Sequence, residues 1–144
     1  MNNTWKTLTK DGNDAFDLCD HFSAEMKYIA ALEVAKHDFQ YTSKPDDAVS
    51  QVIVSYLNLA DNYIEMKMIE QATTFLLQAF RAMEHLEQRT LPDDWKHACF
   101  QGKRRIVEAF WALKKHHPDL PLCEKCYAKI FGTEGHEMAH QTLH

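Results

Sequence analysis

Apolar residues recur at intervals of three and four along almost the whole chain, and short polar breaks separate the runs. This spacing puts the apolar side chains on one face of a helix, whereas a strand would alternate apolar and polar residues. The pattern therefore predicts an all-α protein. We expect about six helices, near residues 4–18, 23–36, 45–65, 70–88, 94–117 and 122–132.

Capping residues mark several of the expected helix ends. The Ser23 hydroxyl is placed to cap the second helix, and Ser43 with Pro45 signals the start of the third. Gly132 is expected to end the sixth helix. Apolar residues cover more than one stripe of the third helix, which predicts burial on two sides and a central place in the domain.

A pattern of small and aromatic residues occurs twice, 48 residues apart. Its members are Gly12, Ala15, Ala24, Tyr28 and Ala31 in the first copy and Ala60, Tyr63, Ala72, Leu76 and Ala79 in the second. Small side chains let two helices approach closely while large ones fill the remaining space. Each copy therefore predicts an antiparallel helix hairpin.

The two hairpins resemble the tetratricopeptide repeat, which implies a short solenoid of stacked hairpins. Tyr56 and Leu59 add to the match in the second copy, and Leu8 adds to it in the first. Asp11 replaces the usual leucine, and the closing proline is absent from both copies. The spacing exceeds the family's repeat by about 14 residues, which we interpret as an insertion around residues 39–51. The chain is also similar to a small family of uncharacterised bacterial proteins, which implies no activity.

The resemblance implies a binding groove lined by the first helix of each hairpin. The residues that would face it are Lys6, Thr9, Asn13 and Phe16 in the first hairpin and Leu57, Asp61, Ile64 and Glu65 in the second. Asn13 would bond to the backbone of a bound peptide, and Asp61 with Glu65 would favour a basic or amphipathic ligand. The alternative is that these are solvated helix positions in a bundle without a groove.

Composition and charge exclude several classes of protein. With 45% apolar and 26% charged residues, the chain is predicted to form one globular domain over residues 1–132, followed by a weakly structured, His-rich tail at 133–144. The net charge of −5, with −6 carried by the first 90 residues, argues against nucleic-acid binding. No apolar run is long enough for a signal peptide or a membrane span, so we expect a cytoplasmic protein.

The C-terminal region suggests a zinc site. Cys123 and Cys126 are followed by His136 and His140, at spacings close to those of Cys2His2 sites. The leading alternative is that the two cysteines are buried as small apolar side chains. Residues 136–140 also match the zinc protease signature, but only four residues follow, and no third ligand is well placed. A redox pair is a further alternative, although the strand that precedes such a pair in thioredoxin-like proteins is missing.

These observations predict an adaptor or chaperone-like protein without enzymatic activity or a required cofactor. Its partner would be a protein or peptide bound in the helical groove, and assembly as a homodimer is left open. The competing prediction is a zinc-binding protein that uses the Cys2His2-type site.

Overall fold

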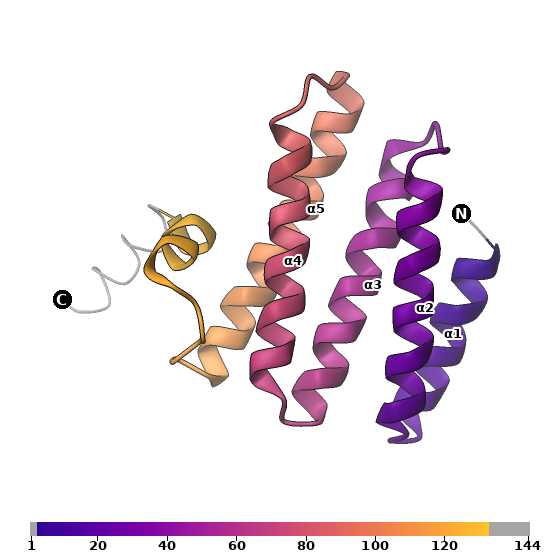
Figure 1. The fold of residues 1–144 in the computed structure, drawn as a ribbon, viewed down its shortest axis with the longest axis vertical. Coiled ribbons are helices and arrows are strands. Elements are labelled where there is room, and N and C mark those ends of the chain that lie inside the picture. The colour runs from indigo at the N-terminus through magenta and orange to yellow at the C-terminus, as the bar shows by residue number, and fades with distance from the viewer. Residues whose placement is uncertain (1–2, 133–144) are drawn as a thin grey trace.

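The computed structural model describes residues 3–132 and confirms the all-α prediction. Its helices are α1 (Asn3–Asp17), α2 (His21–Phe39), α3 (Pro45–Glu65), α4 (Ile69–Glu87) and α5 (Asp93–His116), followed by a sixth helix at residues 124–132 (Figure 1). Over this part of the chain there are no strands. The predicted tail, residues 133–144, lies outside the described residues.

From α1 to α5, consecutive helices pack against one another as antiparallel neighbours (Figure 1). The α3 helix contacts α2, α4 and α5, so its predicted central position is confirmed. By contrast, α1 packs mainly on α2 and makes only minor contacts with α3. Helices α1, α3 and α5 thus lie on one side of the row, and α3 and α5 are in closer contact than α1 and α3. The arrangement is repeat-like.

The turns of the first two hairpins repeat in atomic detail. In the first, the N–H groups of Leu18, Cys19 and Asp20 donate to the carbonyls of Asp14, Phe16 and Ala15. In the second, residues 66, 67 and 68 donate to residues 62, 64 and 63, which is the same pattern shifted by 48 positions. Cys19 and Lys67 both have a φ of 60° at the equivalent place. The 48-residue pattern in the sequence therefore corresponds to a structural repeat.

The extra residues predicted around positions 39–51 do not form a separate segment between the hairpins. Helix α2 continues to Phe39 and α3 begins at Pro45, so only residues 40–44 form a loop. The extra residues lengthen α2 and α3 to 19 and 21 residues. Helix lengthening preserves the stacking of neighbouring helices, because it adds turns along the axis without changing the face that packs.

Two of the predicted caps are also wrong. Asp20 caps α2, and its Oδ1 atom accepts a hydrogen bond of 3.2 Å from the Ser23 N–H, so the Ser23 hydroxyl is not the cap. Lys44 occupies the cap position of α3 without a side-chain hydrogen bond, although Pro45 does begin the helix. Burial of the apolar face therefore matters more for α3 than its cap.

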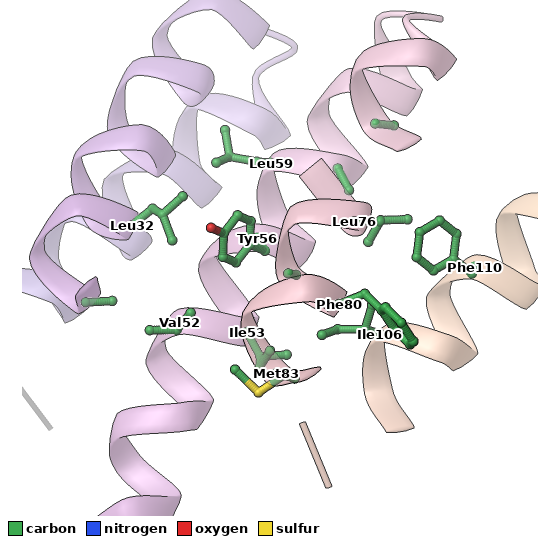
Figure 2. Packing of buried hydrophobic residues seen from close by; sticks show 14 of the residues in the cluster. Leu32, Val52, Ile53, Tyr56, Leu59, Leu76, Phe80, Met83, Ile106 and Phe110 are labelled. Atoms are coloured by element: carbon green, nitrogen blue, oxygen red, sulfur yellow. The ribbon is translucent and has the colours of Figure 1, made fainter. Parts of the chain in front are cut away.

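The core is continuous through α2, α3, α4 and α5 (Figure 2). Ile53, Leu59, Leu76, Phe80 and Phe110 are among its largest fully buried apolar side chains. Complete burial of each such side chain stabilises the fold by about 1.5–3 kcal/mol relative to exposure. Along the described chain, no helix is both long and apolar enough to cross a membrane.

The sixth helix is held on α5 by aromatic contacts. Ile130 and Phe131 are buried, and the Phe131 ring lies 4.8 Å from the ring of Trp111, edge to face. The Lys114 ammonium lies 4.8–5.0 Å from the rings of Trp111, Tyr127 and Phe131. Gly132, with a φ of 53°, follows this anchored segment, as predicted for the end of the helix.

Candidate functional site

A pocket of about 270 Å³ opens between α3 and α5, with Leu76 of α4 in its wall. Helix α3 contributes Leu57, Ala60, Asp61 and Ile64, and α5 contributes Ala109, Ala112, Leu113 and His116. The alanines leave the space, because longer side chains at these positions would fill it. This volume lies just below the range of about 300–1,000 Å³ that is typical of small-molecule sites. The pocket is suited to one or two apolar side chains of a partner.

The two sides of the pocket rim carry different polar side chains, acids on α3 and histidines at the end of α5. On the α3 side, Asp61 lines the pocket and Glu65 follows one turn later. Desolvation raises the pKa of Asp61, and the negative charge of Glu65 raises it further. Asp61 is nevertheless an exposed residue, so solvent reduces the cost of its charge, and a cation bound beside it would favour the ionised form. On the α5 side, the rim is formed by His116 and His117.

The second-hairpin residues predicted from the sequence lie together in space. Leu57, Asp61 and Ile64 all line the pocket, and Glu65 acts on Asp61 through its charge. Their one-turn spacing on α3 produces this grouping, because residues three and four apart share a helix face.

The first-hairpin residues lie elsewhere, on α1, which is not part of this pocket. Lys6 is exposed, and the Thr9 Oγ1 atom is buried without a hydrogen-bond partner among the described residues. Asn13 Oδ1 accepts a 2.7 Å hydrogen bond from the Tyr28 hydroxyl, and Phe16 packs edge to face on His21 at 5.5 Å. Asn13 and Phe16 thus help to join α1 to α2.

Sequence reasoning missed the α5 side of the pocket. Ala109, Ala112 and His116 come from a helix that lacks a full repeat pattern. The available signal was Gly102 on the same helix. A Cβ atom there would lie 2.8 Å from Val49 Cγ1 on α3, so the glycine permits the close approach of α5 to α3.

A second apolar surface lies on the outer face of α2. Phe22, Met26 and Ile29 are exposed there, and Leu18 precedes them in the turn. Met26 and Ile29 are 58% and 38% exposed. An apolar stripe of this kind is a candidate contact surface for a protein.

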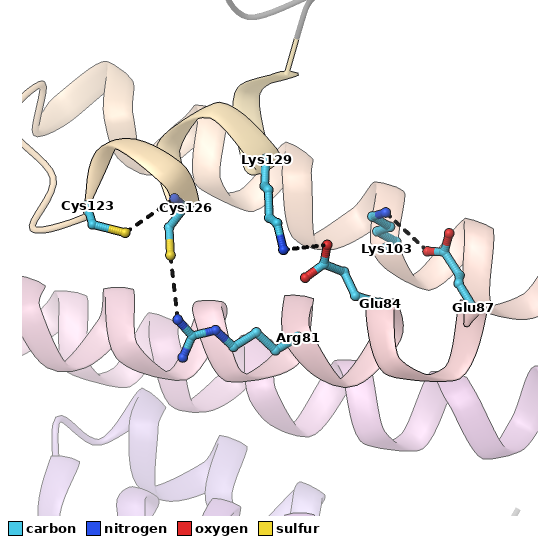
Figure 3. Close-up of polar contacts among 7 residues, drawn as sticks. All are labelled: Arg81, Glu84, Glu87, Lys103, Cys123, Cys126 and Lys129. Carbon is cyan, nitrogen blue, oxygen red and sulfur yellow. Dashed lines mark hydrogen bonds and ion pairs between the residues drawn. The ribbon is translucent and has the colours of Figure 1, made fainter. Parts of the chain in front are cut away.

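The two C-terminal cysteines are not buried, so the buried-thiol prediction is wrong. Cys123 is exposed at the start of the sixth helix, and Cys126 is half-buried one turn later. The Cys126 N–H donates to Cys123 Sγ at 3.3 Å, and the Arg81 guanidinium donates to Cys126 Sγ at 3.5 Å (Figure 3). Hydrogen bonds from the Cys126 N–H and thiol lower the pKa of Cys123, with a smaller contribution from the positive charge of Arg81.

The zinc site stays a prediction. Cys123 and Cys126 lie in one helical turn, as two ligands of a single metal ion would, but His136 and His140 lie outside the described residues. Within residues 3–132, there is no group of three or more His, Cys, Asp or Glu side chains that could hold a metal ion.

The fold and the site define an all-α protein of stacked helices with a small apolar pocket between α3 and α5. Residues 3–144 match the family described as Protein of unknown function (DUF2753), and the chain belongs to this family. No curated protein and no solved structure matches it.

Proposed function

We propose that this protein is a tetratricopeptide-like adaptor or chaperone-type protein that binds a basic, amphipathic segment of a partner protein. The α3–α5 pocket is its binding site, and the protein acts by binding rather than by catalysis. The observation that carries this proposal is the pairing of an apolar pocket of about 270 Å³ with an acidic rim at Asp61.

The repeat geometry supports the tetratricopeptide-like class. Equivalent hydrogen bonds close the turns of the first two hairpins, and small residues occur at Gly12, Ala60 and Gly102 in the three first helices. In this proposal, α5 and the sixth helix form a third, divergent hairpin. Repeat proteins of this kind use the side formed by their first helices as a concave binding surface.

Charge and shape together define the partner. The pocket can receive an apolar side chain, and a lysine or arginine one turn away in the partner would lie beside Asp61 and Glu65. Such spacing belongs to an amphipathic helix, which presents apolar anchors and charges at intervals of three and four residues. The cation would also relieve the repulsion between the two carboxylates.

The variant Asp61→Lys/Glu65→Lys is expected to capture no more than about a tenth of the partner that the wild-type protein captures, because like charges facing each other cost several kcal/mol. The measurement is a crosslinked pull-down from the source cells, quantified by mass spectrometry. Folding of the variant is checked by circular dichroism.

A matched control carries the same change in net charge elsewhere. The variant Asp11→Lys/Glu33→Lys alters exposed acids on α1 and α2 and should retain the partner. Capture at the wild-type level by both variants would show that the acids beside the pocket are not used. Loss of capture to the same extent in both variants would show that overall charge, rather than this site, controls binding.

A further inference from the structure

Cys123 and Cys126 lie at the edge of a second pocket, separate from the α3–α5 pocket. This pocket of about 220 Å³ lies between α4 and the sixth helix, and Arg81, Glu84, Lys125 and Lys129 line it together with the two cysteines. Figure 3 shows the sulfur of Cys126 directed toward Arg81 on α4. The two thiols thus border an open space rather than the core.

The local geometry assigns different roles to the two cysteines. Cys123 is exposed at the helix start, where its sulfur accepts the Cys126 N–H at 3.3 Å. The exposed sulfur of Cys123 is the one of the two that a disulfide reagent can reach from solvent, and exchange requires such access. Cys126 is half-buried against Arg81 and is less accessible to a large reagent. An exposed first cysteine and a shielded second one are the arrangement that a two-step exchange requires.

The surrounding contacts hold this pair in place. Lys129 on the same helix pairs with Glu84 of α4 at 3.6 Å, and Phe131 is buried against α5. The sixth helix is therefore attached to both α4 and α5. With Lys129 paired to Glu84, the positive charges of Arg81 and Lys125 remain to attract an anionic reagent.

We propose that Cys123 and Cys126 form a thiol–disulfide exchange site for a small anionic disulfide of the glutathione type. Cys123 is the attacking thiol, Cys126 is the resolving thiol, and Arg81 positions Cys126. The product is an intramolecular Cys123–Cys126 disulfide, which cysteines three residues apart in a first helical turn can form with small backbone adjustments.

The exchange proceeds in two balanced steps. The Cys123 thiolate attacks one sulfur of glutathione disulfide, forms a mixed disulfide and expels one glutathione thiolate. Cys126 then loses its proton, attacks the Cys123 sulfur and expels the second glutathione thiolate. The protein gives up two electrons and two protons, and one glutathione disulfide becomes two glutathione thiols. Reduction by a dithiol runs the same steps in reverse.

The experiment treats the full, reduced chain with glutathione disulfide and identifies the products by peptide mass spectrometry. We expect the Cys123–Cys126 disulfide in the wild-type protein and a lasting glutathione adduct on Cys123 in Cys126→Ser. Cys19 is exposed in a turn and has no cysteine three residues away, so it is the internal control. Cys123 should react at least about fivefold faster than Cys19.

A second variant separates the role of Arg81 from general stability. Arg81→Met should slow closure of the intramolecular disulfide several-fold, whereas Arg89→Met, which lies beyond the end of α4 and outside this pocket, should not change it. Equal rates at Cys123 and Cys19, or a lasting glutathione adduct on Cys123 in the wild-type protein, would overturn the proposal. Bound zinc that protects both cysteines in the purified protein would overturn it in favour of a metal site.

Discussion

Replacing Asn62 with alanine is expected to lower the free energy of unfolding by about 2–4 kcal/mol. Asn62 is fully buried on α3, its Oδ1 lies 2.9 Å from His21 Nδ1, and its Nδ2 donates to the His21 carbonyl at 2.9 Å. The substitution removes both hydrogen bonds, opens a cavity and leaves the polar atoms of His21 without their partner. Chemical denaturation monitored by circular dichroism measures the effect.

Two controls test whether these hydrogen bonds are the cause. Asn58→Ala removes the same side chain from a half-buried position on α3 and should cost less than about 1 kcal/mol. His21→Ala combined with Asn62→Ala should show a coupling energy of about 1 kcal/mol. The hydrogen bond between the His21 ring and the Asn62 amide is the one that both substitutions remove, whereas the His21 carbonyl is still present in His21→Ala. If Asn62→Ala costs no more than Asn58→Ala, the polar tie between α2 and α3 is not important for stability.

Replacing Gly12 with alanine is expected to lower the free energy of unfolding by about 1–3 kcal/mol. A Cβ atom at Gly12 would lie 2.5 Å from Tyr28 Cε1, well inside van der Waals contact. The Tyr28 ring is 3% exposed, and its hydroxyl is bound to Asn13 Oδ1, so the ring has little room to move. Alanine has a higher helix propensity by about 1 kcal/mol, but this gain is smaller than the steric cost at such a distance.

Gly102→Ala is the matched control for Gly12→Ala. It gains the same helix propensity, but its nearest contact is 2.8 Å to a methyl group of Val49, which can shift more easily than a ring. We therefore expect a smaller loss at Gly102. Tyr28→Phe, which frees the ring from Asn13, should recover part of the loss in Gly12→Ala. Equal costs at both glycines, or stabilisation by Gly12→Ala, would contradict the close packing of α1 on α2.

The helices and the repeat could be predicted because both depend on local patterns. Apolar spacing placed all six helices within a few residues of their observed ends, and the 48-residue pattern corresponds to matching turns. The residues on α3 that line the pocket could also be predicted, because Leu57, Asp61 and Ile64 share one helix face.

Features that depend on tertiary contacts or unusual backbone geometry could not be predicted. The hairpin turns use Cys19 and Lys67 in the left-handed region, where glycine is the usual signal. Prediction of the pocket wall formed by α5 would require knowing how close α5 lies to α3. Cys123 occupies an apolar stripe in the sequence, yet it lies at the exposed start of its helix, where no element covers it.

The most direct test of the proposed function is to ask which surface the partner touches. A photoreactive amino acid placed at Ala112, an exposed position in the wall of the α3–α5 pocket, should crosslink to the partner in cells. The same group placed at Met26, on the exposed stripe of α2, should not. The crosslink at position 112 should disappear with Asp61→Lys/Glu65→Lys. Crosslinks at position 26 without any at 112, whether to another protein or to a second copy of this chain, would contradict the assignment of the α3–α5 pocket as the binding site.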